Sequence, residues 1–475
     1  MQRDYAPGRS RRLLLILLSV GSAVAANNAI AAQAEPAGGV TGQGQSADDA
    51  PNVPASDAPR VYGPTMPTAV QASHTMPVPA WGGAPAGVPP ALTDALNLST
   101  HYNPAVVAAW ATVRAMHADL SNVRWQRLPS LSTGYNQYSA GAYAHYPSVT
   151  VNMPVATFGR IGAQIDRAKA QQAIAIGAWR LKVIEIAVQT EQSYFQVIAA
   201  TRKQKILDEG AKEHLRLVES MARRVVEGVS PHADLLLARS RLEQIQSDLE
   251  AVNAQRLTAL RNLSELLQGH PLGLGAVPTY DPKANDADWD GAEEQAVVYS
   301  PAREQALATA DSARDDITAA KASLFPELDA QYSYDPIYGS RVGLALKLQA
   351  SGGLSQFSRI TAAQDRFDAA LAQVRDVERQ VRQQVDDQVV ANHSARTQAS
   401  ISADVASTAR EVSDSYERQF IAGHRSWLDV MNALREDINT RLTKVTAEVT
   451  AMDTAAQLML ETGRWQPSLA EENSK

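Results

Sequence analysis

The sequence predicts a mainly α-helical protein with a small β part, built from two similar halves that each contain a very long helix. Three observations lead to this fold class. Residues 355–421 form a run of 67 residues without glycine or proline. The same order of helical and strand-like segments occurs twice along the chain. Short stretches of alternating apolar and polar residues interrupt both halves, which is the pattern of strands with two unlike faces.

The helical segments are too long for a compact globular domain. At 1.5 Å per residue, residues 355–421 would extend over roughly 100 Å as a helix. Residues 163–227 contain no proline and would extend about as far. Apolar residues recur every three or four positions, as at Leu242, Ile245 and Leu249. This spacing predicts that the helices pack side by side along a coiled-coil-like seam.

Each half has the order helix, two strands, long helix, turn and shorter helix, which indicates an internal repeat. In the first half the helices are expected at residues 91–127, 160–227 and 232–268, with the strands between the first two. In the second half they are expected at residues 301–324, 355–421 and 426–462.

The ends of the chain differ in composition from these halves. Arg9, Arg11 and Arg12 precede a short apolar run at residues 13–20, which predicts a secretory signal peptide and is too short for a membrane-spanning helix. Eleven of the 24 prolines lie in residues 35–90, which favours a mobile arm. The expected organisation is a signal peptide (1–34), a Pro/Gly/Ala-rich mobile arm (35–90), a first repeat (91–270), a connector or equatorial segment (271–300), a second repeat (301–465) and a C-terminal tail (466–475).

The strand-like stretches predict insertion into a membrane. Val342, Leu344, Leu346 and Leu348 alternate with small or polar residues, and the stretch that contains Val149 shows the same alternation. Half of the 14 tyrosines cluster on these stretches, as an interfacial girdle requires: Tyr135, Tyr138, Tyr143, Tyr146, Tyr332, Tyr334 and Tyr338. A pair of soluble hairpins is the alternative. Four strands cannot close a barrel around a lumen, so membrane insertion would require several chains to pool their strands.

Composition argues against several other classes. The net charge of −7 argues against a nucleic-acid partner. The chain has no cysteine, which removes disulfides and thiol chemistry. Its nine histidines show no metal-ligand spacing, and no Gly-rich loop follows a strand. The expectation is therefore a protein that is not an enzyme and that holds no cofactor and no metal.

From about Ala91 to Trp465 the chain resembles the TolC family of outer-membrane efflux and secretion proteins. Several short motifs carry the resemblance through their twofold order: Leu128-Pro129, Phe325-Pro326, Phe158-Gly159-Arg160, Glu227-Gly228-Val229-Ser230 with Asp234, and Ala422-Gly423-His424-Arg425 with Asp429. The resemblance implies a homotrimer in the outer membrane of a Gram-negative bacterium. It implies a TolC-like α-barrel through the periplasm, joined to a shared 12-stranded transmembrane β-barrel. The implied partners are a periplasmic adaptor protein and an inner-membrane ABC transporter or proton-driven pump.

The resemblance also implies functional residues at the periplasmic tip. A gate latch is expected from Asp234, Arg425 and Phe420, where Phe420 replaces the tyrosine usual in the family. A pore constriction is expected at Asp429 and Asn432. The tip turns and the partner-docking surface would include Gly228, Ser230, Gly423 and an exposed Trp427. Helix N-capping, or a charge in the first helical turn, is the alternative role for Asp234 and Asp429.

Residues 415–423, 426–430 and 432–433 are similar to the LapE-like subgroup that exports large surface adhesins. We therefore expect the outer-membrane channel of a type I secretion system, a passive exit duct for a protein substrate. The outer-membrane factor of a tripartite drug or solute efflux pump is the alternative, and a soluble periplasmic adaptor is a third.

Overall fold

The computed structural model describes residues 76, 77, 79–137, 145–284, 287–348 and 355–469. The chain divides into two units, Met1–Pro67 and Thr68–Lys475, and all the described residues belong to the second. The predicted signal peptide and most of the predicted arm lie outside the described residues, as do Tyr138 and Tyr143 of the predicted aromatic girdle.

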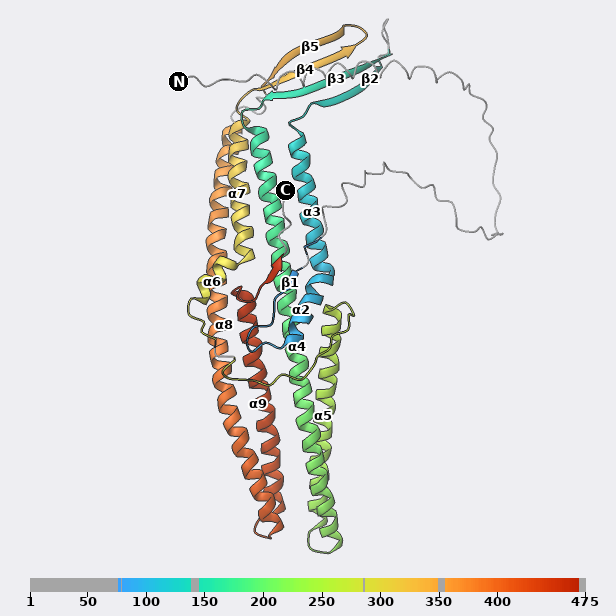
Figure 1. Cartoon of the computed structure of the whole chain (residues 1–475), viewed down its shortest axis with the longest axis vertical. Helices are drawn as coiled ribbons and strands as arrows, with labels where there is room; N and C mark the ends of the chain where they lie inside the picture. The colour runs from blue at the N-terminus through green and yellow to red at the C-terminus, as the bar shows by residue number, and fades with distance from the viewer. Residues whose placement is uncertain (1–75, 78, 138–144, 285–286, 349–354, 470–475) are drawn as a thin grey trace, which may run out of the picture. The chain divides into compact units, whose positions relative to one another are not determined.

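Two long helical hairpins and a small sheet form the second unit (Figure 1). The first half contains α3 (Pro104–Trp125), β2 (Ser130–Gln137), β3 (His145–Ala156), α4 (Arg160–Val226) and α5 (His232–Leu266). The second half contains α7 (Pro301–Ala322), β4 (Glu327–Asp335), β5 (Gly339–Lys347), α8 (Ser355–Ile421) and α9 (Trp427–Glu461). Helices α4 and α8 have 67 residues each, and α5 and α9 have 35 each. The predicted run at 355–421 is therefore confirmed as one helix.

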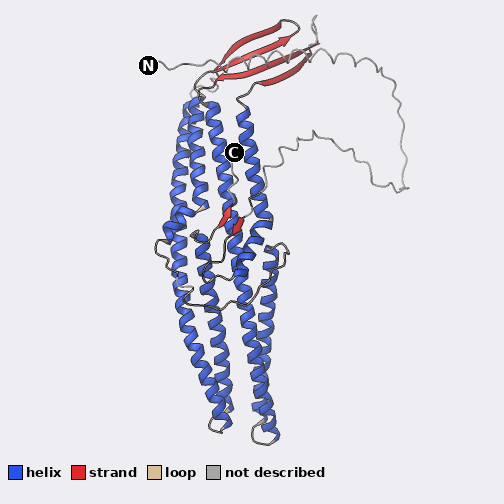
Figure 2. Cartoon of the chain, in the orientation of Figure 1, coloured by secondary structure: helices blue, strands red, loops and turns tan. Residues whose placement is uncertain are grey.

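The four-stranded sheet joins the two halves at one end of the helices (Figure 2). Its order is β2-β3-β4-β5, and every neighbouring pair is antiparallel. The pairing of β3 with β4, in which Val151 lies opposite Tyr332, connects the first half to the second. The sheet leaves one edge of β2 and one edge of β5 without a neighbouring strand among the described residues.

Residues of the Phe158-Gly159-Arg160 motif, which follows the first pair of strands, contact residues at the Phe325-Pro326 motif, which precedes the second pair. Phe158 and Phe325 stack with their ring centroids 5.7 Å apart. The Arg160 Nη2 atom donates a hydrogen bond of 2.9 Å to Glu327 Oε2. These contacts cross from the start of α4 in the first half to the start of β4 in the second, so they fix the two halves against each other.

The first predicted helix, 91–127, is interrupted in the structure. It consists of α2 (Pro90–Tyr102) and α3, which begins at Pro104. Asn103 between them has an extended backbone, as is usual before proline, and its side chain accepts a 2.9 Å hydrogen bond from Ala105 N. The proline therefore begins a second helix, whereas a single continuous helix was expected.

The last part of the predicted mobile arm is built into the fold, so that expectation is wrong for residues 79–90. Strand β1 (Pro79–Trp81) pairs with β6 (Pro467–Leu469). Trp81 is 5 % exposed and packs edge-on against Trp465 at 5.5 Å, while its Nε1 atom donates to Thr100 Oγ1 at 3.2 Å. One buried tryptophan thus anchors this segment to the core, although the Pro-rich composition around it predicted a mobile arm.

The connector attaches to α8 and to the residues that follow α9. The Trp289 Nε1 atom donates a 3.2 Å hydrogen bond to Asn392 Oδ1 on α8, and both residues are buried. Arg464 lies over the Trp289 ring at 4.7 Å and donates to the Asp288 carbonyl at 2.6 Å. Helix α6 (Ala292–Tyr299) packs against α8.

Helix α4 is the element around which the others pack, since it contacts α3, α5, α7 and α9. Its large buried side chains, among them Trp179, Tyr194 and Phe195, form the centre of the main apolar core. At Gly210 a Cβ atom would lie 2.5 Å from Ile438 Cδ1, so glycine permits the close approach of α9. Among the described helices, none is both long enough and apolar enough to cross a membrane.

Candidate functional site: the hairpin tips and the seam above them

The two tip turns have the same geometry. Gly228 (φ 73°) and Gly423 (φ 78°) follow the ends of α4 and α8, and both adopt the left-handed conformation that glycine favours. The Val229 amide donates to the Arg224 carbonyl at 2.8 Å, and the His424 amide donates to the Gln419 carbonyl at 2.9 Å. These bonds satisfy the last helical carbonyls and reverse the chain. Ser230 lies in the first turn, and its Oγ accepts from Arg224 Nε at 3.4 Å.

Arg425 is held within its own hairpin. Its guanidinium lies 4.3 Å from the centroid of the Tyr416 ring and donates to Gln419 Oε1 at 3.2 Å. Its Nη1 atom is 3.8 Å from Asp429 Oδ2. Among the described residues of the single chain, Arg425 and Asp234 form no ion pair. A latch between these two residues stays a prediction, and within one chain Tyr416 provides the aromatic partner of Arg425.

The other two predicted latch residues, Phe420 and Asp234, have contacts that do not involve Arg425. Phe420 is half-buried and receives the Arg224 guanidinium 5.1 Å from its ring centroid, a cation–π contact that links α8 to α4. Asp234 is half-buried in the first turn of α5, where the helix dipole favours a negative charge. The structure therefore shows the first-turn position that was the alternative interpretation of Asp234.

Trp427 is half-buried, so the expectation of an exposed tryptophan is wrong. It packs against the apolar cluster at the tip of the other hairpin, formed by Val218 and Met221 of α4 and Leu235 and Ala238 of α5. Burying an aromatic ring between hairpins contributes more to stability than exposing it at a tip. Trp427 thus ties α9 to the first half.

The predicted constriction residues occupy the first turns of α9. Asp429 is half-buried, and its backbone N–H donates to the capping Ser426 Oγ at 3.2 Å. Asn432 is exposed and lines a cleft of about 130 Å³ between α5 and α9, together with Arg241, Asp248 and Arg435. Their place in a pore stays a prediction.

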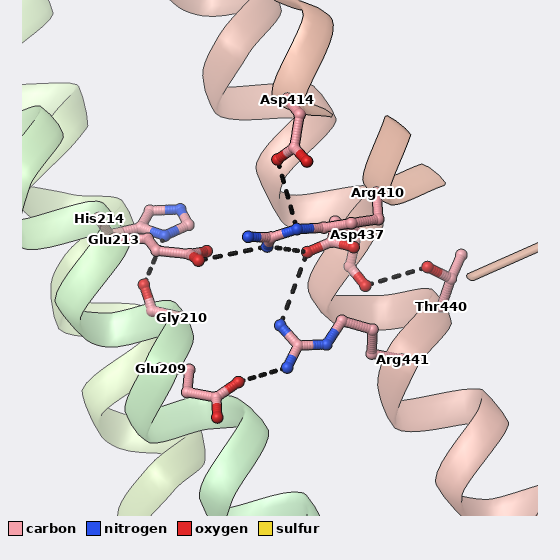
Figure 3. A network of polar contacts seen from close by, with 9 residues as sticks. All are labelled: Glu209, Gly210, Glu213, His214, Arg410, Asp414, Asp437, Thr440 and Arg441. Carbon is pink, nitrogen blue, oxygen red and sulfur yellow. Dashed lines mark hydrogen bonds and ion pairs between the residues drawn. The ribbon is translucent and has the colours of Figure 1, made fainter. Parts of the chain in front are cut away.

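Above the tips, a network of charged side chains crosses the seam between the halves (Figure 3). Arg410 Nη1 of α8 contacts Glu213 Oε1 of α4 at 3.2 Å and Asp437 Oδ2 of α9 at 3.0 Å. Arg441 of α9 pairs with Glu209 of α4, and its Nη1 atom lies 3.7 Å from the same Asp437 oxygen. Asp437 is fully buried, so the two guanidinium groups supply the charge that its burial requires.

The electrostatics of this network follow from its geometry. Burial lowers the pKa of Arg410, but hydrogen bonds to Asp437 and Glu213 outweigh this effect and raise the pKa overall. Nearby, burial lowers the pKa of His214, although its Nδ1 donates to the Gly210 carbonyl at 3.0 Å. The arginine side of the network therefore stays charged, while the neighbouring imidazole is neutral at neutral pH.

Sequence reasoning did not find this network. Its members are separated by up to 232 residues, as in the Arg441–Glu209 pair, and each is an ordinary charged residue on a long polar helix. The available signal was the glycine at position 210 inside a helix, which marks a close helix approach beside Glu209 and Glu213. No group of three acidic or histidine side chains among the described residues is placed to hold a metal ion.

The fold is thus a pair of helical hairpins with matched tip turns, joined to a sheet at the far end of the helices. Residues 95–269 match the family described as outer membrane efflux protein. This match covers less than half of the chain, from α2 to the turn after α5.

Solved structures share the fold at low sequence identity. A membrane protein from Pseudomonas aeruginosa superposes with a TM-score of 0.70 at 18 % identity, covering 82 % of this chain and 98 % of that one. CusC, described for its folding and transmembrane channel formation, gives a TM-score of 0.71 at 17 % identity, covering 82 % and 97 %. Protein CyaE of Bordetella pertussis is 23 % identical over 253 residues, which is 50 % of this chain and 53 % of that protein. The chain thus spans about half the length of this curated relative.

Replacing Arg410 tests the charged network. Arg410→Gln leaves Glu213 without its cation and leaves buried Asp437 with Arg441 alone. Since Arg410 is 42 % exposed, we expect a loss of only about 1–3 kcal/mol in the free energy of unfolding. Denaturant unfolding measures it. Exposed Arg418 on the same helix is the control, and Arg418→Gln should change stability by less than about 0.5 kcal/mol. Equal effects of the two substitutions would contradict a structural role for the network.

Proposed function

We propose that the chain is the outer-membrane channel of a type I secretion system. It acts as a passive exit duct across the periplasm and the outer membrane for a protein substrate, a large adhesin. The main support for this proposal is the sheet at the end of the hairpins. One face of this sheet is apolar and exposed.

The strand register extends this apolar face across all four strands. On β5, Val342, Leu344 and Leu346 are 84 %, 71 % and 68 % exposed. Their partners on β4 are Tyr332, Ala330 and Leu328. The same face continues through neighbouring strands to Val151, Val149 and Leu131. Paired residues of a sheet share a face, so the alternate positions form a second face that is polar: Ser132, Thr150, Ser333, Arg341 and Lys347. One apolar and one polar face suit a strand between lipid and an aqueous lumen.

The open edges of the sheet support an oligomer, and the oligomer that we propose is a trimer. Strands β2 and β5 end the sheet, and unpaired backbone groups cannot remain in lipid. Three copies of this four-stranded sheet supply twelve strands, enough to close a barrel, since the smallest membrane barrels have about 8. The two hairpins of each copy would then line the periplasmic part of the duct.

A pair of lysine substitutions tests the lipid-facing surface. Leu344→Lys places a charge on the apolar face and should reduce the amount of trimer assembled in the outer membrane, since a lysine facing lipid costs about 2–4 kcal/mol near the midplane. Gly343→Lys is the matched control on the polar face, where a side chain meets open space. Membrane fractionation and native gels measure assembly. If both variants assemble equally well, the apolar face does not contact lipid.

The tip is proposed as the gate of the duct, with Arg425 reaching Asp234 of a neighbouring copy. Arg425→Ala should raise single-channel conductance in planar bilayers without loss of the trimer, and Asp234→Ala should do the same. Each exposed pair contributes about 1 kcal/mol or less, so the effect depends on three latches acting together. If neither substitution changes conductance, Arg425 stabilises only its own turn through Tyr416 and Asp429.

The proposed partners are a periplasmic adaptor and an inner-membrane ABC transporter, which would meet the hairpin tips. Exposed apolar side chains support docking there, since Val226 is 88 % and Ile421 is 79 % exposed. Residues 415–423 and 426–430, which are similar to the adhesin-exporting subgroup, include the second tip turn. This local similarity is the support for a protein cargo. The family description, outer membrane efflux protein, favours the alternative of a tripartite drug or solute pump.

Deletion of the gene distinguishes the two cargoes. For the secretion duct, we expect loss of a large repeat-rich protein from the cell surface and weaker surface attachment, with near-normal drug sensitivity. Surface proteomics, attachment assays and drug-sensitivity assays measure these outcomes. An unchanged surface proteome with a many-fold rise in drug or dye sensitivity would establish the efflux alternative.

A further inference from the structure

A buried acidic residue lies in the main apolar core without a hydrogen-bond donor. Glu191 of α4 is fully buried, and among the described residues no N–H group or hydroxyl donates a hydrogen bond to either of its carboxylate oxygens. Its neighbours along the helix include Tyr194 and Phe195, both in the apolar core. An ionised carboxylate is strongly disfavoured in such surroundings, because nothing replaces the water that it loses. A protonated carboxyl avoids this penalty.

The groups that face Glu191 from the packed helices do not supply a positive charge. The charged groups that act on it are Asp453 and Glu461 of α9, and both are acidic. Helix α8 contributes amides: Gln384 and Gln388 donate to Glu461 Oε1 at 3.1 and 2.9 Å. Burial raises the pKa of all three carboxyl groups, and for Glu191 the charge of Asp453 raises it further.

Other carboxylates of the same seam are paired differently. Glu448 pairs with Arg202, and Glu209 pairs with Arg441, so each acid on one helix meets an arginine on the other. Glu191 and Asp453 instead bring two acids from α4 and α9 within hydrogen-bonding reach of each other. Two ionised carboxylates repel, whereas a carboxyl hydroxyl donates to a carboxylate in a short, charge-assisted bond. A proton between these two buried acids would therefore take the place that an arginine takes in the other pairs of the seam.

We propose that Glu191 and Asp453 share one proton, and that this proton holds α4 against α9. The pair is thus a proton-binding site on the seam between the two halves. The folded protein retains a proton that the unfolded chain releases. Its contribution to stability is full below the ordinary carboxyl pKa and is lost as pH rises through the raised pKa of the folded pair. The seam therefore weakens in alkaline solution.

Thermal unfolding of the full-length protein in detergent tests the proposal. As the pH rises from the ordinary carboxyl range into alkaline solution, the unfolding temperature of the wild type should fall, because the pair loses its proton. Glu191→Gln keeps the shape and donates a hydrogen bond to Asp453 without titrating. It should flatten this dependence and raise the unfolding temperature at the alkaline end by about 2 °C. Glu185→Gln, on the exposed face of the same helix, should keep the wild-type dependence.

Infrared spectroscopy detects the proton directly and does not depend on the variant's stability. The wild type at neutral pH should show the C=O stretch of a protonated carboxylic acid, and Glu191→Gln should lose most of this band. Asp453→Asn is the second variant and should also remove it. The proposal is overturned if the wild type shows no such band, or if Glu191→Gln keeps the wild-type pH dependence of unfolding.

Discussion

Helices of 67 residues cannot bury their apolar stripes against themselves, and the rest of this structure depends on that constraint. An isolated helix is only marginally stable in water, so each long helix needs neighbours along its whole length. α4 obtains them from both halves of the chain: α3 and α7 on the side of the sheet, and α5 and α9 toward the tips. The contact with α9 is the one that joins the hairpins, and it is maintained by different means along its length. Gly210 permits close approach, arginine–carboxylate pairs satisfy buried charge, and Trp427 fills the tip.

The long-range organisation could be predicted from the sequence because periodicity, glycine and proline are local signals. The run 355–421 contains neither breaker, and it forms α8 with those bounds. The alternation of Val342, Leu344 and Leu346 likewise predicted a strand with unlike faces. The division of residues 91–127 at Pro104 was missed, although proline is itself a local signal that ends or restarts a helix. The burial of Trp81 was hidden by the composition of the segment around it.

Much of the candidate site could not be predicted, because its contacts join residues far apart in sequence. Arg410, Asp437 and Glu213 come from three different helices, and nothing in the sequence of one helix indicates the rotation of the next. Family motifs placed Arg425 and Phe420 at the tip, where the structure has them. Their partners within one chain, Tyr416 and Arg224, were not part of those motifs. Trp427 is the clearest example. From the sequence alone, a tryptophan beside a turn could be exposed or packed, and only the position of the neighbouring hairpin shows that it is packed.

The pairing of β1 with β6 has a consequence for how the chain reaches this fold. Ser468 Oγ donates to the Ala80 carbonyl across 388 residues of sequence, and Trp81 packs on Trp465 beside it. During synthesis the N-terminal strand emerges long before its partner exists, and closing so large a loop is slow. Trp81 therefore remains without its partner until Trp465 and β6 have been synthesised. The β1–β6 pair can therefore form only in a chain that has been completed through β6.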